Sequence, residues 1–388
     1  LMLDLPNIVL KNKCNKNFRC PKNIKVDKCN MKNDKYWGDI VGGLRPYVPG
    51  EQPKNTNLIK LNTNENPYPP SPEVREAVIT ELDGQLRLYP DPNADRLKKE
   101  ISNAFNVKAD KIFVGNGSDE VLAHIFHAFF KQDKPIFFPD VTYSFYEVYC
   151  SLYQVPYQLI PLTDDLSINF DDYKRPNGGI IFPNPNAPTG RLLSLLAVEN
   201  LLKDNQDSVV VVDEAYIDFG GESVAPLTSR YPNLLVTQSL SKSRSLAGLR
   251  VGFAIGNSSL ISALNQIKNS FNSYPLDSLA ISGSVAALND RNYFEGVCKK
   301  VVKSRSELAL GLSSLGFSVV PSAANFLFVT HSKHNAAGLL SALRGKGILV
   351  RHFNKPRISE YLRISIGLPE QNTCLLEALK EITEGQAC

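Results

Sequence analysis

The feature that most constrains the fold is a regular alternation of short apolar strands with helices from about residue 107 onward. The strand predicted at 208–212 contains four valines in a row and is therefore apolar on both faces. A parallel sheet that helices cover on both sides requires such strands. We predict an α/β fold in which a large, doubly wound, mostly parallel sheet of about seven strands is joined to a smaller α+β domain. The strands are predicted at 111–115, 135–138, 155–160, 179–182, 208–212, 234–239 and 251–255, and helices between them at 118–130, 144–153 and 194–203.

The length of 388 residues exceeds one simple core and predicts several domains. A long helical stretch is predicted at 276–315. The strands predicted after it, at 317–320, 325–330, 347–351 and 361–365, are typical of an α+β domain. The predicted regions are a disordered basic extension at 1–35, an N-terminal arm with a small-domain segment at 36–66, a large domain at 67–285 and a small C-terminal domain at 286–388.

Charge and cysteine content exclude several classes of protein. The net charge of +4 is concentrated in residues 1–35, which carry +6, so the remaining chain carries −2. A nearly neutral body does not indicate a general nucleic-acid surface. The seven cysteines are odd in number and form no CxxC pair, which argues against a disulfide framework or a zinc site. No apolar run reaches the roughly 18 residues that span a bilayer, and a cytoplasmic protein is expected.

The stretch at 239–252, SLSKSRSLAGLRVG, carries the strongest chemical signal because Lys242 stands just past the end of a predicted strand. The amine of Lys242 can condense with an aldehyde. The side chains of Ser239, Ser241 and Arg250 can bind a phosphate by charge-assisted hydrogen bonds. The stretch is therefore suited to a phosphorylated aldehyde, although its composition alone also fits a solvated basic loop.

A second stretch follows the strand at 208–212, where Asp213 ends the apolar run and Tyr216 comes three residues later. A carboxylate in this place can pair with a pyridinium nitrogen and keep the ring protonated, so that the ring withdraws electrons. The tyrosine can donate to a ring hydroxyl. Alone, the stretch also fits a helix-capping aspartate beside a packed tyrosine.

Two turns complete the set of candidate site segments. The sequence GNGSDE at 115–120 lies between a predicted strand and a predicted helix, where free backbone N–H groups bind phosphate. It contains Gly117, Ser118 and Asp119, and Ser118 also fits an N-cap. The sequence NPNAPTG at 184–190 predicts a stiff turn that either holds the amide of Asn186 against a ring or is a plain turn.

In this order, the four stretches resemble those of the aspartate-aminotransferase superfamily, the fold type I enzymes that use pyridoxal 5′-phosphate. More narrowly, the chain resembles the histidinol-phosphate aminotransferase family. The matching stretches are LRPYVPGE at 44–51, LNTNENPY at 61–68, LYPD at 88–91 and LRISIG at 362–367. The resemblance covers about residues 36–384. It implies pyridoxal 5′-phosphate as the cofactor, bound in the large domain at 67–285.

The resemblance implies a role for each residue that matches the family pattern. Lys242 would form the Schiff base with the cofactor and then carry the proton. Asp213 would pair with the pyridine nitrogen, and Tyr216 would contact the ring hydroxyl. Tyr143 would stack on the ring, with Asn186 beside it. The residues implied at the cofactor phosphate or near it are Gly117, Ser118, Asp119, Ser239, Ser241 and Arg250, with Tyr89 reaching it from the other subunit.

The resemblance also implies the partners of the chain. It implies a homodimer with shared active sites and small-molecule substrates, with no nucleic acid, membrane or metal. The implied reaction converts L-histidinol phosphate and 2-oxoglutarate into imidazole-acetol phosphate and glutamate, a step of histidine biosynthesis. The residues implied to bind the anionic group of the substrate are Tyr47, Asn325, Arg351 and Arg363.

One position departs from the family pattern. The family has two asparagines before Pro-Thr-Gly, and the second contacts the ring hydroxyl, but here Ala187 occupies that place. Either Asn186 takes over with a shifted backbone or Tyr216 acts alone.

Other functions fit parts of the sequence. Aromatic-amino-acid aminotransferase and threonine-phosphate decarboxylase share the cofactor residues. A nucleotide-binding α/β module without catalysis would hold no coloured cofactor. A basic-tailed RNA-binding protein would lose its affinity at high salt and on removal of residues 1–30. Transamination of histidinol phosphate is the preferred prediction.

Overall fold

The computed structural model describes residues 35–54, 57–82 and 85–385. The basic extension predicted at 1–35 lies outside the described residues, apart from Lys35. The chain divides into two compact units, Leu1–Leu44 and Arg45–Cys388. The sheets and α-helices of the described residues all belong to the second unit. Across the three described ranges, no helix is both long enough and apolar enough to cross a bilayer.

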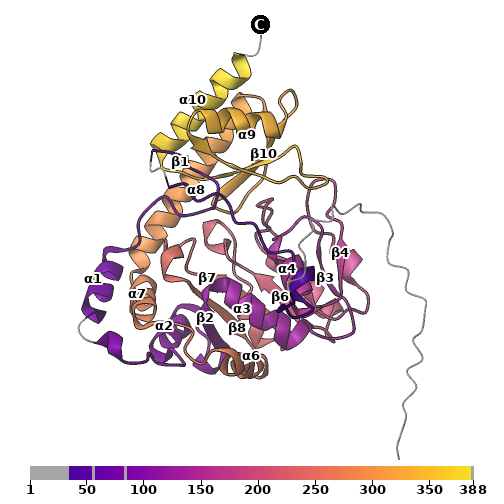
Figure 1. Cartoon of the computed structure of the whole chain (residues 1–388), viewed down its shortest axis with the longest axis vertical. Helices are drawn as coiled ribbons and strands as arrows, with labels where there is room; N and C mark the ends of the chain where they lie inside the picture. The colour runs from indigo at the N-terminus through magenta and orange to yellow at the C-terminus, as the bar shows by residue number, and fades with distance from the viewer. Residues whose placement is uncertain (1–34, 55–56, 83–84, 386–388) are drawn as a thin grey trace, which may run out of the picture. The chain divides into compact units, whose positions relative to one another are not determined.

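A seven-stranded sheet lies in the second unit (Figure 1). In the order in which they pair, its strands are β2 (Ile112–Asn116), β8 (Val251–Gly256), β7 (Leu234–Ser239), β6 (Val210–Asp213), β5 (Ile180–Pro183), β3 (Ile136–Pro139) and β4 (Tyr157–Ile160). All pairs are parallel except those of β8, which runs antiparallel to both β2 and β7. The predicted mostly parallel α/β sheet is confirmed, and each strand begins and ends within two residues of its predicted bounds.

Helices cover both faces of this sheet because successive strand residues point to opposite sides. Val211 of β6 belongs to one buried cluster and its neighbour Val210 to another. The helices over the first cluster are α3 (Gly117–Ile125), α4 (Phe145–Tyr153) and α6 (Ser258–Phe271). The helices over the opposite face are α5 (Leu195–Asp204) and, toward β2 and β8, α1 (Pro72–Glu81), α2 (Asp95–Phe105) and α7 (Ser278–Asn289).

Two predicted helices are interrupted. The helix predicted at 118–130 is α3 followed by a π-helical turn, Phe126–Phe130. The stretch predicted at 276–315 is α7 and a separate helix α8 (Arg291–Ser314). Asp290 lies between them, where its side chain accepts a hydrogen bond from the backbone N–H of Tyr293 and caps α8. A capping aspartate satisfies a backbone donor that the first turn of a helix leaves unpaired.

The C-terminal part contains a smaller, four-stranded antiparallel sheet (Figure 1). Its strands, in order, are β12 (Arg351–His352), β13 (Leu362–Ser365), β10 (Phe326–His331) and β9 (Phe317–Val320). The helices that share its core are α8, α9 (Ala336–Gly345) and α10 (Pro369–Glu384). A separate parallel pair joins β1 (Ile59–Lys60) to β11 (Ile348–Leu349). The smaller α+β domain is thus confirmed, with β11 and β12 in place of the single strand predicted at 347–351, while the exact domain boundaries stay predictions.

The direction of β8 determines which residues meet at one edge of the large sheet. Parallel strands place the loops that follow them at their common carboxyl edge. Because β8 runs the other way, Arg250, which precedes it, lies at the same edge as the ends of β2 and β7. Gly252 allows β8 to approach the start of α3, since a Cβ at Gly252 would lie 2.4 Å from the backbone nitrogen of Ser118.

We expect Gly252→Ala to destabilise the protein by about 1–3 kcal/mol, because the added methyl group would overlap the backbone at the start of α3. Denaturant unfolding followed by circular dichroism measures this change. Gly296→Ala is the matched control, since a Cβ at Gly296 of α8 meets no atom within 4 Å. Equal stabilities of the two variants would contradict the close approach of β8 at Gly252 to the start of α3.

Candidate active site

One cavity of about 490 Å³ opens at the carboxyl edge of the large sheet and is also lined by residues of the small sheet. Lys242, in the loop after β7, and Asp213, the last residue of β6, both line it. The predicted site residues that line this cavity are Tyr47, Ser118, Asp119, Tyr143, Asp213, Tyr216, Ser239, Ser241, Lys242, Arg250, Arg351 and Arg363. The fold therefore brings together most of the residues that the sequence singled out.

Four predicted site residues do not line the cavity. Gly117 lies behind it, with φ +82°, and a Cβ there would lie 2.4 Å from Nη2 of Arg250. Tyr89 is 83% exposed and stacks on Tyr274, with 4.8 Å between the ring centroids. Asn186 and Asn325 are both buried. The predicted roles of these four residues stay predictions.

The amide of Asn186 is engaged with the loop after β3 and with its own turn. Its Nδ2 donates to the carbonyl of Val141 and to Oγ1 of Thr189, both at 3.0 Å, so both amide hydrogens have acceptors. Its Oδ1 accepts from Oγ1 of Thr142 at 3.3 Å. Ala187 lines the cavity instead and packs near Tyr216. Of the two alternatives for this position, these hydrogen bonds favour the one in which Asn186 does not replace the missing amide.

One end of the cavity is built to receive an anion. Ser118 lies in the first turn of α3, where backbone N–H groups are free of helical partners. Ser239 ends β7 and Ser241 lies in the loop after it, where Oγ of Ser239 accepts from the backbone nitrogen of Ser241 at 3.1 Å. The guanidinium of Arg250 adds the positive charge. Asp119 orients it, with Nη2 of Arg250 at 3.1 Å from the carboxylate.

Asp213 is a buried carboxyl group at the end of β6. Burial raises its pKa to about 6, although hydrogen bonds from the backbone nitrogen of Ala215 and the hydroxyl of Tyr146, both at 3.2 Å, act in the opposite direction. Within the described residues, no lysine or arginine forms an ion pair with it. A buried carboxylate with hydrogen bonds but no cation is suited to a cationic ligand, because the ligand would offset the cost of burying the charge.

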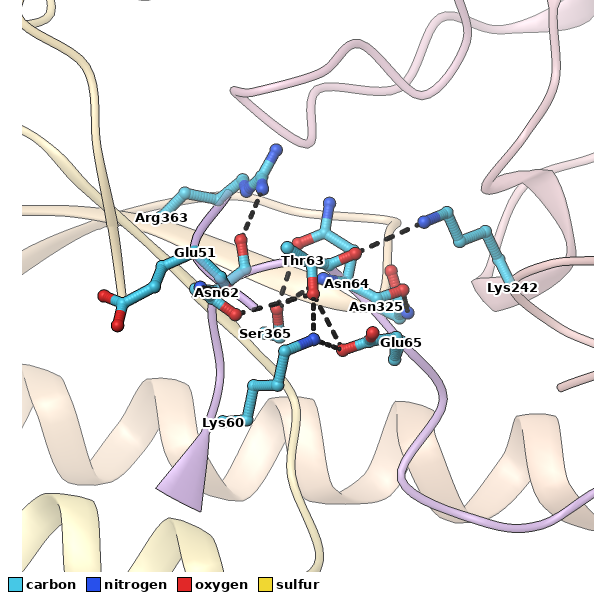
Figure 2. Close-up of polar contacts among 10 residues, drawn as sticks. All are labelled: Glu51, Lys60, Asn62, Thr63, Asn64, Glu65, Lys242, Asn325, Arg363 and Ser365. Carbon is cyan, nitrogen blue, oxygen red and sulfur yellow. Dashed lines mark hydrogen bonds and ion pairs between the residues drawn. The ribbon is translucent and has the colours of Figure 1, made fainter. Parts of the chain in front are cut away.

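Lys242 projects toward the segment at 62–65 (Figure 2). Its Nζ donates to the carbonyl of Thr63 at 3.4 Å and lies 5.8 Å from the ring centroid of Tyr216. Lys355 also lines the cavity, but its amine is engaged in an ion pair with Glu147 at 3.0 Å. Lys242 is therefore the better candidate for a reactive amine.

Two arginines face each other in the small sheet. Arg351 and Arg363 are directly paired across β12 and β13, an arrangement that places like charges side by side. Burial lowers the pKa of Arg363, whose Nη2 donates to the carbonyl of Asn62 at 2.9 Å. Its Nε has no hydrogen-bond partner among the described residues. A guanidinium pair without a carboxylate is suited to bind an anion such as a phosphate or a carboxylate.

The segment at 62–65 lines the cavity but had no predicted role. Asn62, Asn64 and Asn66 alternate along it, just before Pro67. Asn62 and Asn64 are each no more than 3% exposed, and a buried amide requires hydrogen-bond partners. The alternating asparagines were the available signal, but Tyr216 and Ser365, the partners of Asn64, lie far away in the sequence.

The raised pKa of Asp213 predicts a pH dependence of stability in the protein without ligands. Its folded pKa of about 6 exceeds the 3.8 of an unperturbed aspartate, so the folded state binds the proton more tightly. The carboxyl group then favours folding at low pH, and this contribution is lost as the pH rises through about 6. In Asp213→Asn this dependence is absent. We therefore expect the stability of the variant relative to the parent to rise by about 1 kcal/mol between about pH 5 and about pH 8.

Denaturant unfolding of both proteins at the two pH values measures the difference. Burial also raises the pKa of Glu214 to about 7. Because both proteins contain Glu214, its titration changes both stabilities alike and leaves their difference unchanged. A variant that loses stability relative to the parent as the pH rises would contradict this assignment.

Comparisons with known proteins agree with this geometry. The family model "Aminotransferase class I and II" matches residues 56–379. Histidinol-phosphate aminotransferase 1 of Methylococcus capsulatus is 60% identical over 352 residues, which cover 91% of this chain and 99% of that protein. Histidinol-phosphate aminotransferase 1 of Pseudomonas aeruginosa is 61% identical over 345 residues, which cover 89% of this chain and 98% of that protein.

A similar fold occurs in histidinol-phosphate aminotransferase from Sinorhizobium meliloti, whose structure is a complex with pyridoxal-5′-phosphate. It matches 92% of this chain and 100% of that chain with a TM-score of 0.83. At 21% identity this likeness shows the shared fold alone. From the family model and the relatives at about 60% identity, the chain belongs to the aminotransferase class I and II family.

Proposed function

We propose that this chain is a pyridoxal-phosphate-dependent aminotransferase that acts on L-histidinol phosphate and 2-oxoglutarate in histidine biosynthesis. The observation that carries the proposal is a single cavity that holds Lys242, the buried carboxyl of Asp213, Arg250 and the arginine pair of the small sheet. The relatives at about 60% identity, which are named histidinol-phosphate aminotransferase, support the choice of substrate.

The residues present fit the cofactor. The carboxyl of Asp213, buried without an ion pair among the described residues, matches a protonated ring nitrogen. Lys242 would hold the aldehyde carbon, and Tyr216 would contact the ring hydroxyl. The phosphate would be held by the first turn of α3, Ser118, Ser239, Ser241 and Arg250. When bound, pyridoxal phosphate withdraws electrons from the substrate carbon that bears the amino group.

The amino group of the substrate would take the place of Lys242 at the aldehyde carbon, and the freed amine of Lys242 would then act as a general base. Its Nζ takes the proton from the α-carbon of the substrate, a step worth roughly 10²–10⁴-fold when the base is held in place. The carbonyl of Thr63, which accepts from Nζ at 3.4 Å, helps to hold the amine over the cavity. Asp213 keeps its negative charge beside the ring nitrogen and so preserves the positive charge there.

The arginine pair would accept two different anions in turn. Histidinol phosphate carries a phosphate and no carboxylate, whereas glutamate and 2-oxoglutarate carry carboxylates. The planar guanidinium groups of Arg351 and Arg363 can bind either group through paired hydrogen bonds. The ring of Phe353 lies 5.5 Å from Arg351 and 5.4 Å from Arg363, and it helps to fix both groups at the cavity wall. Tyr47, which lines the same cavity, would contribute a hydroxyl group.

The proposed assembly is a homodimer in which Tyr89 reaches the cofactor phosphate of the partner subunit. Three apolar residues that lie close to Tyr89 in the sequence, Leu82, Leu86 and Leu88, are each about half exposed. A group of exposed apolar residues is typical of a protein–protein interface. The exposure of Tyr89, outside the cavity of its own chain, also supports a role in another subunit.

The proposed reaction is tested by mixing the cofactor-loaded protein with histidinol phosphate and 2-oxoglutarate and measuring glutamate formation. We expect turnover in the parent. We expect a fall in kcat/KM of at least roughly thirtyfold in Arg363→Gln, because loss of a buried charged partner costs about 2–5 kcal/mol.

Arg344→Gln is the matched control, since Arg344 forms an ion pair with Glu51 outside the cavity and its loss should leave kcat/KM unchanged. Release of carbon dioxide from threonine phosphate without glutamate formation would assign the chain to the decarboxylases. A strong preference for aromatic amino acids would assign it to the aromatic aminotransferases.

Shared active sites predict complementation between two inactive variants. Tyr89→Ala would lack the tyrosine that enters the partner's site, and Lys242→Ala would lack the amine of its own site. A mixed dimer contains one site with both residues, so co-refolding the two variants should restore transamination measured as glutamate formation. Each variant refolded alone is the control. A mixture no more active than the better single variant would contradict shared sites.

A further inference from the structure

Asn64 belongs to the segment at 62–65, which lines the cavity (Figure 2). Three successive carbonyls of this segment each accept a hydrogen bond from a distant side chain. The carbonyl of Asn62 accepts from Arg363 at 2.9 Å, that of Thr63 from Lys242 at 3.4 Å, and that of Asn64 from Asn325 at 2.9 Å. In the view of Figure 2, Arg363 and Lys242 reach the segment from opposite sides.

The side chain of Asn64 is fixed by its own hydrogen bonds. The residue is 1% exposed and has a φ of +54°, a left-handed conformation that asparagine tolerates better than most residues. Its backbone nitrogen donates to Oγ of Ser365 at 2.9 Å, and its Oδ1 accepts from the same hydroxyl at 3.0 Å. Its Nδ2 donates to the hydroxyl oxygen of Tyr216 at 3.0 Å.

This network determines the orientation of the amide. Oγ of Ser365 accepts a hydrogen from the backbone of Asn64 and donates its own single hydrogen to Oδ1. Exchanging Oδ1 and Nδ2 would leave the hydrogen of Ser365 without this acceptor. The amide nitrogen therefore faces Tyr216, whose hydroxyl oxygen is the acceptor.

The ring of Tyr216 is held from other directions by apolar contacts. It meets Phe326 edge to face, with centroids 5.1 Å apart and planes at 90°. Ala187, Ala324 and Phe326 form the small buried cluster against which it packs. Asn64 thus donates a hydrogen bond to the hydroxyl of Tyr216, while these apolar residues hold its ring. Because the hydroxyl accepts from Asn64, its hydrogen is available to donate into the cavity that Tyr216 lines.

We propose that Asn64 is a positioning residue that aims the hydroxyl hydrogen of Tyr216 at the ring hydroxyl of the cofactor. The inference rests on the proposed function, in which Tyr216 contacts that ring hydroxyl. In this arrangement the amide of Asn64 acts on the cofactor through Tyr216. Asn64 lies 123 positions before Ala187, the place where the family has its second asparagine. Tyr216 therefore does not act alone: Asn64 supplies the amide, and the amide of Asn186 stays bonded to Val141 and Thr189.

The test is a double-mutant cycle on the affinity for pyridoxal phosphate. The dissociation constant is measured by titrating the cofactor-free protein, as parent, Asn64→Asp, Tyr216→Phe and the double variant. Aspartate has nearly the same size, but its carboxylate only accepts hydrogen bonds, so it would take the hydrogen of Tyr216 for itself. We expect Asn64→Asp to weaken binding about three- to tenfold in the parent and to have almost no effect in Tyr216→Phe.

A second variant, Asn64→Gly, tests the same point without a new charge. Glycine adopts a φ of +54° readily, so the loss is confined to the side chain. We expect the same dependence on Tyr216. The visible absorbance of the bound cofactor changes with pH. We expect Asn64→Gly to shift the pH of this change relative to the parent, and we expect no such shift when Asn64→Gly is added to Tyr216→Phe.

Asn62→Asp is the matched control, because the amide of Asn62 donates to the carbonyl of Glu51 at 2.9 Å and not to Tyr216. Its effect should add to that of Tyr216→Phe. If the effects of Asn64 variants also add, or if these variants bind the cofactor like the parent or fail to fold, Asn64 is at most structural and the proposal is overturned. A parent that binds no pyridoxal phosphate would overturn the proposed function together with this inference.

Discussion

The antiparallel course of β8 is the constraint on which the site depends. If β8 ran parallel to its neighbours, Arg250 at its start would lie at the edge of the sheet opposite to the ends of β2 and β7. The observed direction brings Arg250 together with Ser118 and Ser239. Asp213 at the end of β6 and Lys242 in the loop after β7 belong to the same edge, so one topological feature gathers the groups proposed to hold the cofactor.

The site also holds charges that the folded protein buries at a cost. Asp213 is buried and Arg363 is half-buried; desolvation raises the pKa of Asp213 and lowers the pKa of Arg363. Neither forms an ion pair among the described residues. Ligands of opposite charge would relieve this cost, and any ligand that binds only the folded state stabilises it. The same arrangement therefore disfavours the ligand-free protein and favours binding of a cation at Asp213 and of an anion at Arg363.

The sequence predicts the large sheet well because its strands are apolar on both faces, a pattern that short segments carry by themselves. It also predicts that Lys242, Asp213 and Arg250 lie at or just beyond the ends of such strands. The break between α7 and α8 was missed because it depends on the cap formed by Asp290, which apolar periodicity does not report. The role of Asn64 was invisible because its partners, Tyr216 and Ser365, are 152 and 301 residues away. The hydrogen bonds of Asn186 to Val141 and Thr189 were likewise not predictable, since Val141 lies 45 residues away in the sequence.

The central claim is that the amine of Lys242 carries the cofactor. Reduction of the pyridoxal-phosphate-loaded protein with borohydride, followed by peptide mapping, tests it most directly, because reduction makes the link between lysine and cofactor permanent. We expect a label on Lys242 that persists in Lys355→Ala, since Lys355 lines the same cavity but is paired with Glu147. A label on Lys355 or on any other lysine, or no label in a protein that binds the cofactor, would contradict the account.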